Sequence, residues 1–320
     1  MNKPLASILI NNHNYGRFLA EAIDSALNQT YASVEVVVVD DGSTDESPDI
    51  IRGYGERIVG VIKGNEGQGS SVNIAFERSR GDYLFLLDSD DVFMPGKVAQ
   101  AVEMFEQHRA IGWVFHPLRL RDAHSGSVLT EMIPPSRRGG LIDFRGRIHR
   151  GRQPLFAPAT SGLCFRRDLL AKMLPMPVVG GTSADRYLKP MALALAPGYY
   201  INEVLAEQKI HGSNAHTLSP RRTQTAAKSM VLVAGWLRSR QPALRKLSIK
   251  MMAKGLGMYD ASGGVDPEYA DTVKQYLECS GPLERLSIAA RRFYHGRIRR
   301  SEYAVAQAPP TARVAPAAGT

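Results

Sequence analysis

Two apolar runs in the first hundred residues end in clusters of aspartate, and this pattern constrains the fold more than any other feature. The runs read VEVVVV and YLFLL, and the acidic residues that follow them are Asp40, Asp41, Asp88, Asp90 and Asp91. Strands of a parallel sheet covered by helices on both faces are continuous Val, Ile and Leu runs, and ligands bind beyond the carboxyl ends of such strands. We therefore expect both clusters to face one crevice.

The second cluster has the spacing of a metal site. Because side chains alternate along an extended segment, Asp88 and Asp90 can point to one side while Ser89 points away. Mg²⁺ and Mn²⁺ prefer carboxylate oxygens, keep several waters and commonly bridge a protein to substrate phosphates. An isolated aspartate triplet would indicate a solvated turn instead. After a buried strand, and paired with Asp40 and Asp41, the triplet predicts a cation and nucleotide site.

Strand and helix patterns alternate through the first half of the chain. Apolar runs predict strands at 5–10, 34–40, 57–63 and 82–88, and helical periodicity or helix-start residues predict helices at 15–29, 45–55, 67–81 and from Pro95 to about His108. Such repeating units predict an α/β fold with a mostly parallel, doubly wound sheet. Beyond residue 118 we expect a long basic loop at 134–154, helices at 165–174 and 183–195, and strand pairs at 198–211.

The C-terminal third is helical in pattern and strongly basic. Residues 221–320 hold 17 Lys and Arg against 7 Asp and Glu, so the other 220 residues hold 23 against 24. A separate basic module points to an anionic membrane leaflet or a nucleic acid, or serves only solubility. Because aromatic residues are not interleaved with the basic ones, we expect no nucleic-acid partner. We predict a catalytic domain at 1–220, a basic helical region at 221–302 and a disordered Ala/Pro-rich tail at 303–320.

Cysteine content and hydropathy indicate where the protein works. Only Cys164 and Cys279 are present, neither with zinc-ligand neighbours, so we expect a reducing cytosol and no disulfide framework. No window approaches the roughly 18 apolar residues of a membrane span. We therefore expect a cytoplasmic protein with neither a signal peptide nor an integral anchor. It would be peripheral at the inner face of the cell membrane if the basic helices dock there.

Two longer motifs identify a family. The stretch SILINNHNYGRFLAEAIDSALNQTYASVEVVVVDDGSTDES, followed by NEGQGSSVNIAFERSRGDYLFLLDSDDVFMPGKV, closely resembles the family-two inverting glycosyltransferases of the GT-A fold. The resemblance covers roughly residues 5–215 and is most specific in residues 7–98. It implies a Rossmann-like GT-A domain with a helical C-terminal extension. It also implies a nucleotide-sugar donor, most commonly a UDP-sugar, and a glycan or lipid-linked acceptor, often in bacterial surface polysaccharide synthesis.

The resemblance assigns the donor site residue by residue. Asp40 and Asp41 match the acidic pair that holds the base and ribose of the sugar nucleotide. Asn11 and Asn14 lie where the family's nucleotide contacts begin. Asn73 matches an asparagine that usually follows a basic residue, but Val72 precedes it here, so one customary nucleotide contact is absent.

The resemblance also implies a metal and a catalytic base. Asp88 and Asp90 match the motif that binds Mn²⁺ or Mg²⁺ on the donor diphosphate, with Asp90 the more direct ligand and Asp91 in support. His211 resembles a histidine that closes over the metal or diphosphate, with Lys209 nearby to counter negative charge. It could equally be a structural histidine.

The general base should begin the helix that follows the acceptor loop. The family commonly has Glu-Asp there, and this chain has Ala184-Asp185, which assigns the base to Asp185. The alternative role for Asp185 is that of a carboxylate stabilised by the helix dipole.

Two other functions compete with transfer. A nucleotide-sugar-binding protein without catalysis would keep the fold, and Val72 and Ala184 make it conceivable. A nucleotidyltransferase would carry a glycine-rich basic loop directly after the first strand. That position reads NNHNYGR here, which argues against it.

Overall fold

The computed structural model describes residues 3–131, 139–154, 158–178, 183–212, 214 and 222–298. Its contacts divide the chain into two compact units, Met1–Lys209 and Ile210–Thr320. The tail predicted for 303–320 lies outside the described residues. Each unit is described by itself.

The first unit is built on the parallel strands that the apolar runs predicted. These strands are β1 (Ala6–Asn12), β2 (Val34–Asp41), β3 (Val59–Lys63) and β4 (Tyr83–Asp88). They pair in the order β3-β2-β1-β4, all parallel. The register sets Asn11 opposite Asp88 and Asn12 opposite Asp40, so both acidic clusters lie at the carboxyl edge of adjoining strands. The two clusters therefore lie at one edge of the sheet, as predicted.

The sheet continues with shorter strands of mixed direction. Next to β4 follow β10 (Leu163–Arg166), β6 (Trp113–Phe115), β11 (Gly198–Tyr200) and β9 (Gly140–Ile142). β10 is antiparallel to both of its neighbours, β6 and β11 are parallel, and β9 is antiparallel to β11. A second sheet contains β5 (Asp91–Phe93), β12 (Ala206–Ile210), β7 (Leu118–Asp122) and β8 (Val128–Glu131).

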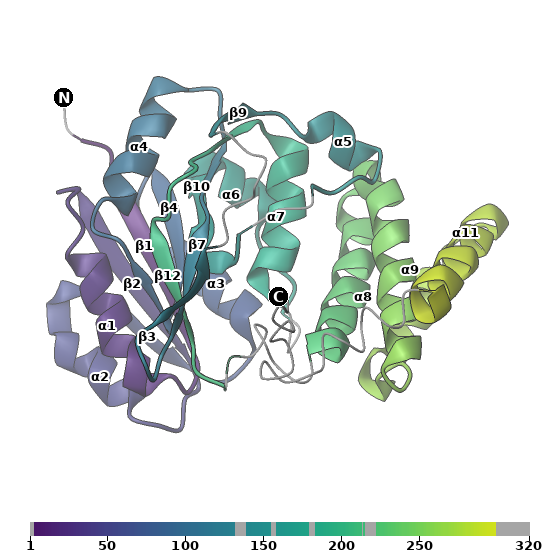
Figure 1. Ribbon diagram of the computed structural model, residues 1–320, viewed down its shortest axis with the longest axis horizontal. Helices are drawn as coiled ribbons and strands as arrows, with labels where there is room; N and C mark the ends of the chain where they lie inside the picture. Colours follow the sequence, from purple (N-terminus) through teal and green to yellow (C-terminus); the bar gives the residue numbers. More distant parts are fainter. Residues whose placement is uncertain are drawn as a thin grey trace, which may run out of the picture. The chain divides into compact units, whose positions relative to one another are not determined.

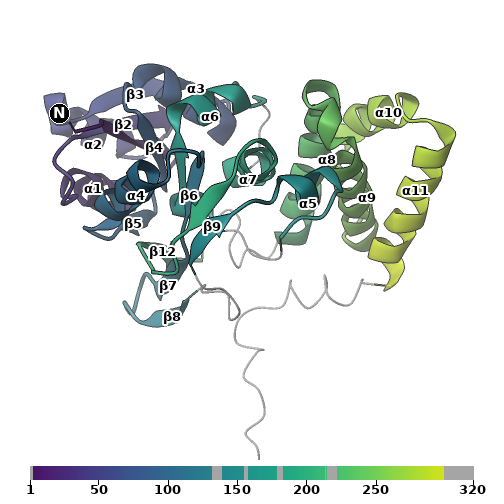
Figure 2. The same ribbon diagram turned by 90° about the horizontal axis from the view of Figure 1, so that it is seen from above.

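Helices cover both faces of the large sheet. They are α1 (Gly16–Leu27), α2 (Ser47–Tyr54), α3 (Gln68–Arg78), α4 (Lys97–Gln107), α5 (Arg145–His149), α6 (Arg167–Met173) and α7 (Ala184–Leu195). α1 and α4 lie on one face, and α3 and α6 on the other (Figures 1 and 2). Short 3₁₀ turns lie at Gly55–Arg57 and Thr160–Gly162. The fold is the predicted α/β architecture.

Burial explains why these segments fold as they do. Ile8 and Ile10 of β1, Val38 of β2 and Phe85 and Leu87 of β4 are buried in one core. Strands between two helical layers bury both faces, and each fully buried aliphatic side chain contributes about 1.5–3 kcal/mol. The core therefore holds the strand ends, and the aspartates on them, in fixed register.

Two predictions beyond residue 118 were wrong in part. The basic segment predicted as a loop contains β9 and α5, although residues 132–138 lie outside the described part. Phe144 and Ile148 are buried and anchor α5, but five residues are too few to show periodicity. The helix predicted from residue 165 begins at Arg167, because Phe165 and Arg166 pair in β10.

The second unit is helical, as predicted. It contains α8 (Arg222–Arg240), α9 (Arg245–Ala261), α10 (Ala270–Glu278) and α11 (Pro282–Phe293), followed by a π-helical turn at Tyr294–Ile298 (Figure 2). Gly255 lets α9 approach α8 closely, since a Cβ there would lie 2.9 Å from Val231 and 3.0 Å from the carbonyl oxygen of Ala227. None of the helices in the described residues has the length and hydropathy needed to span a membrane.

Candidate active site

Asp40 is the last residue but one of β2 and holds the loop that follows the strand. Its Oδ1 accepts hydrogen bonds from Asn12 Nδ2 at 2.7 Å and from the Ser43 hydroxyl at 2.5 Å, and its Oδ2 accepts from the Ser43 backbone at 3.0 Å. The Asp40 side chain is buried. These contacts fix the first turn after β2, at the carboxyl edge of the sheet.

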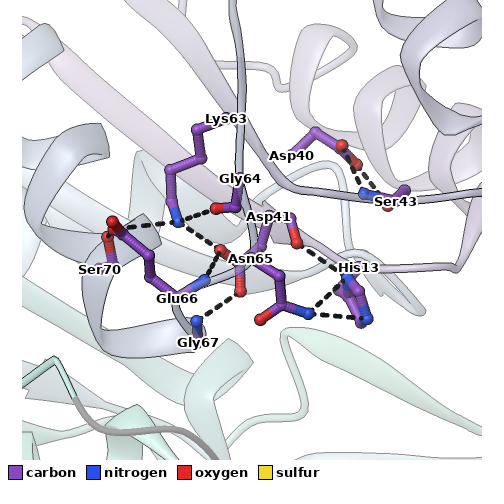
Figure 3. A network of polar contacts seen from close by, with 10 residues as sticks. All are labelled: His13, Asp40, Asp41, Ser43, Lys63, Gly64, Asn65, Glu66, Gly67 and Ser70. Atoms are coloured by element: carbon purple, nitrogen blue, oxygen red, sulfur yellow. Dashed lines mark hydrogen bonds and ion pairs between the residues drawn. The ribbon is translucent and has the colours of Figure 1, made fainter.

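Asp41 organises the glycine-rich segment that opens α3. Its carboxylate accepts backbone hydrogen bonds from Glu66 at 2.9 Å and Gly67 at 2.7 Å and pairs with Lys63 (Figure 3). Asp41 therefore shapes the loop between β3 and α3, in addition to any contact with a ligand.

His13 and Asn14 connect β1 to the same region. The His13 ring contacts the carbonyl oxygen of Asp41 at 2.9 Å and the side chain of Asn65 (Figure 3). Asn14 adopts φ +57°, and its Oδ1 accepts from the Thr44 backbone at 2.7 Å. Asn tolerates this left-handed conformation better than most residues. The predicted nucleotide residues Asn14, Asp40 and Asp41 thus lie in one continuous network.

The DSDD segment turns sharply at the end of β4. Asp88 and Asp90 are half-buried, whereas Ser89 and Asp91 are buried, which is the alternation that the sequence predicted. Burial, together with the charges of Asp90 and Asp185, raises the pKa of Asp88 to about 7, and hydrogen bonds from Asn11 and Thr160 offset part of that rise. The first-strand asparagine, the aspartate motif and the helix that carries Asp185 therefore come together in one place.

Ser161 supports this turn, and no sequence pattern indicated this role. Its hydroxyl donates to Asp91 Oδ2 at 2.6 Å and accepts from the Asp88 backbone at 3.1 Å. Its carbonyl accepts from Lys97 Nζ at 2.6 Å, and Lys97 lies over the ring of Phe93. Burial lowers the pKa of Lys97 to about 7. Because Ser161 is some 70 residues from the motif, only the fold brings them together.

Asp185 lies in the first turn of α7, where the helix dipole favours a negative charge. Its Oδ2 accepts from Lys189 Nζ at 2.5 Å, and Ser183 donates to its other oxygen. Burial by itself raises the pKa of Asp185, but the charges of Lys189 and Arg186 outweigh burial and hold it well below its ordinary value. The side chain remains 15 % exposed. Asp185 is thus a charged carboxylate with access to a ligand.

The carboxylates of this site fit a divalent cation that a substrate helps to hold. Among the described residues, no group of three or more His, Cys, Asp and Glu side chains could hold a metal by itself. Mg²⁺ is usually bound by one or two carboxylates plus substrate phosphates, so two aspartates are a sufficient protein contribution. Burial and the neighbouring negative charges raise the pKa of Asp88, and a bound cation would offset that charge repulsion.

Two further predicted site residues have protein contacts of their own. Asn73 exchanges two hydrogen bonds with the Met176 backbone, at 2.7 and 3.0 Å, and so anchors the segment after α6. His211 belongs to the second unit, is buried, and contacts Asn214 through its backbone N–H at 2.8 Å and through Nε2 at 3.1 Å. Their roles toward a ligand stay predictions.

Sequence comparison decides the family. The model of glycosyl transferase family 2 matches residues 7–173. The chain belongs to glycosyltransferase family 2. An uncharacterized glycosyltransferase of Nostoc sp. is 35% identical over 217 residues, 66% of each chain. An uncharacterized glycosyltransferase of Rickettsia prowazekii is 40% identical over 104 residues, so the present chain spans 33% of the length of that relative.

Solved structures agree with the fold. The family 2 chain is similar to S. aureus TarS 1–349 in complex with UDP-GlcNAc, with a TM-score of 0.60 and 17% identity over 95% of this chain and 92% of that one. It is also similar to a mannosyltransferase of Pyrobaculum calidifontis in complex with GDP-Man and Mn²⁺, with a TM-score of 0.53 and 16% identity over 94% and 88% of the two chains. The architecture is therefore that of known glycosyltransferases.

Proposed function

We propose that this protein transfers a sugar, with inversion, from a nucleotide-sugar donor to a hydroxyl of a glycan or lipid-linked acceptor. The observation that carries the proposal is that Asp88, Asp90 and Asp185 lie close together, so that burial and the charges of Asp90 and Asp185 raise the pKa of Asp88. Asp88 and Asp90 suit a cation that binds a diphosphate, and Asp185 suits a general base. The UDP-GlcNAc and GDP-Man complexes of the structural neighbours support a nucleotide-sugar donor. UDP-sugars are the first donors to test, and surface polysaccharides the first acceptors.

The roles follow from charge and position. Asp40, Asp41, Asn11 and Asn14 line the nucleotide end, where a rigid hydrogen-bonded edge can hold a base and ribose. A Mn²⁺ or Mg²⁺ ion held by Asp88 and Asp90 would stabilise negative charge on the leaving diphosphate oxygen. His211 and Asn73 are further candidates for this end.

Asp185 acts on the acceptor. It takes the proton of the acceptor hydroxyl as that oxygen attacks the anomeric carbon. The bond to the diphosphate oxygen breaks as the new bond forms, and the leaving group departs from the opposite face. A single displacement of this kind inverts the anomeric configuration and needs no second carboxylate as a nucleophile.

The test is a panel of UDP-, GDP-, dTDP- and CDP-sugars, each with Mn²⁺ and with chelator, followed by thermal unfolding. A ligand at a hundredfold its Kd adds about 2.7 kcal/mol to the free energy of unfolding. We expect a metal-dependent rise in Tm with one nucleotide. A transfer assay with that donor should then show that Asp185→Asn lowers turnover about 10²–10⁴-fold while leaving the Tm shift intact.

The control is Asp168→Asn, because Asp168 is exposed and lies in the first turn of α6 as Asp185 does in α7. It should keep full activity. A native protein that binds the donor but transfers nothing to any acceptor would support the non-catalytic binding function instead. No Tm shift with any nucleotide would argue against both functions.

We also propose that α11 docks the protein on the anionic inner leaflet of the membrane. Ile288 packs inward, whereas Leu283, Leu286 and Phe293 are 82 %, 68 % and 62 % exposed. Exposed arginines on α11 and on the turn that follows it, Arg291 and Arg297, complement an acidic surface. Basic amphipathic helices with Leu and Phe on one face lie in the interface of such membranes.

Co-sedimentation with vesicles that contain anionic lipid tests this surface. Replacing Leu286 and Phe293 by Ser should lower the bound fraction severalfold, and raised salt should lower binding of the native protein. Leu141→Ser is the matched control, since Leu141 is 61 % exposed in the first unit. Equal sedimentation of the double variant and the native chain would contradict the proposal.

A further inference from the structure

Gln68 contacts both halves of the proposed active site. It is the first residue of α3 and follows Gly67, whose φ is +94°. Its Nε2 donates to Asp88 Oδ1 at 2.8 Å, and its Oε1 accepts from the backbone N–H of Ala184 at 2.8 Å. These partners lie 20 and 116 residues away along the chain.

The Ala184 contact caps α7 from another element. The first backbone N–H groups of a helix have no intrahelical partner and need an external acceptor. In the described structure, Ser183 supplies no side-chain cap, because its hydroxyl donates to Asp185 instead. Gln68 accepts the first of these N–H groups, one residue before Asp185. The amide oxygen therefore fixes the start of the helix that carries the proposed base.

The Asp88 contact orients a carboxylate without neutralising it. A lysine or arginine at this position would pair with Asp88 and compete with a divalent cation. The amide of Gln68 is uncharged, so it holds Asp88 Oδ1 in place while the charge of Asp88 stays available to a cation. Partners that orient metal-binding carboxylates in this way are typically worth 10–100-fold in metal affinity or activity.

We propose that Gln68 is a positioning residue that sets the proposed metal-binding carboxylate and the proposed base in one geometry; this inference rests on the proposed function. The side-chain amide has a donor, Nε2, which binds Asp88, and an acceptor, Oε1, which binds the backbone of Ala184. Gln68 thereby links the carboxyl edge of β4 to the amino end of α7. A shift of α3 would move both groups together.

Three variants separate the two contacts. Gln68→Leu removes both, Gln68→Glu keeps an acceptor for Ala184 but places a second carboxylate beside Asp88, and Gln107→Leu is the control. Gln107 is exposed and bonds only to Glu103 through its side chain in the described structure. The measurements are kcat and KM for the donor, activity against Mn²⁺ concentration, and the Tm shift caused by Mn²⁺ with the best nucleoside diphosphate.

Gln68→Leu should lower kcat about 10–100-fold with little change in donor KM, and should raise the Mn²⁺ concentration needed for half-maximal activity. In Gln68→Glu the main change should be in the Mn²⁺ dependence. The inference is overturned if Gln68→Leu matches Gln107→Leu in kcat and in Mn²⁺ dependence, or if both Gln68 variants lose only Tm.

Failure of the proposed function would look different. A native protein without transfer activity would overturn that function. The Tm shift with Mn²⁺ and nucleotide would still test the Asp88 contact, since Gln68→Leu should reduce that shift and Gln107→Leu should not.

Discussion

At the residue scale, Asp185 combines two opposing demands. A general base works best with a pKa near the working pH, yet Lys189 and Arg186 hold the pKa of Asp185 well below its ordinary value. The ion pair keeps the carboxylate charged before the acceptor binds. The negative charge of the donor diphosphate would raise the pKa of Asp185, as the charge of Asp185 raises the pKa of Asp88. Binding of the donor would therefore make Asp185 a stronger base when the acceptor reacts.

Removing Lys189 should change the pH profile in a defined direction. If Asp185 is the base, activity requires its charged form and is lost as pH falls through the pKa of Asp185. Burial raises the pKa of Asp185 and the Lys189 charge lowers it, so removing that charge raises the pKa. The acidic limb of kcat/KM should then move to higher pH. Lys189→Met tests this, with exposed Lys172→Met as the control. An acidic limb that stays in place in Lys189→Met would argue against Asp185 as the base.

At the element scale, two glycines show how tightly the strands and helices are packed. Gly198 in β11 faces the buried indole of Trp113, and a Cβ there would overlap that ring. Gly53 in α2 is exposed, and a Cβ there would meet nothing within 4 Å. The same substitution should therefore have opposite signs at the two positions.

Urea unfolding measures both effects. Gly198→Ala should lower the free energy of unfolding by about 1–3 kcal/mol, because Trp113 or β11 must shift. Gly53→Ala should raise it by about 0.5–1 kcal/mol, because Ala loses less conformational freedom than Gly in a helix. Equal effects at the two positions would show that β11 and Trp113 do not pack as described.

Sequence patterns predicted the elements whose signals are long and local. β1, β2 and β4 are mostly apolar runs, and the structure places the aspartates that end β2 and β4 at one edge of the sheet, as the sequence predicted. β5 and β9 have three residues each, too few for any periodicity, and both were missed. Gln68 and Ser161 act through partners that are distant along the chain, so only the folded structure could reveal them.

At the scale of the whole molecule, each unit carries one cysteine. Cys164 is buried in the first unit, and Cys279 is exposed in the second. Burial also raises the pKa of the Cys164 thiol to about 11, which lowers its reactive thiolate fraction further. Cys279 should therefore react with a labelling reagent in the native protein, and Cys164 should react only when the first unit unfolds.

A Cys279→Ser variant turns this difference into a reporter of the first unit. Its labelling rate in mild denaturant measures the opening of the Cys164 core, whatever the second unit does. Donor nucleotide with Mn²⁺ should slow this labelling if it binds the first unit. Rapid labelling of Cys164 in native buffer would contradict the packing of β10.

The strand order has an evolutionary consequence. One uninterrupted stretch, from β1 to β4, supplies the parallel strands and the aspartates of the proposed donor site. The continuation of mixed direction comes from a later stretch whose strands are joined by long connections. Insertions there leave the register of β1, β2 and β4 untouched. If the proposed function is correct, changes in the second stretch could alter the acceptor while the first stretch keeps the donor chemistry.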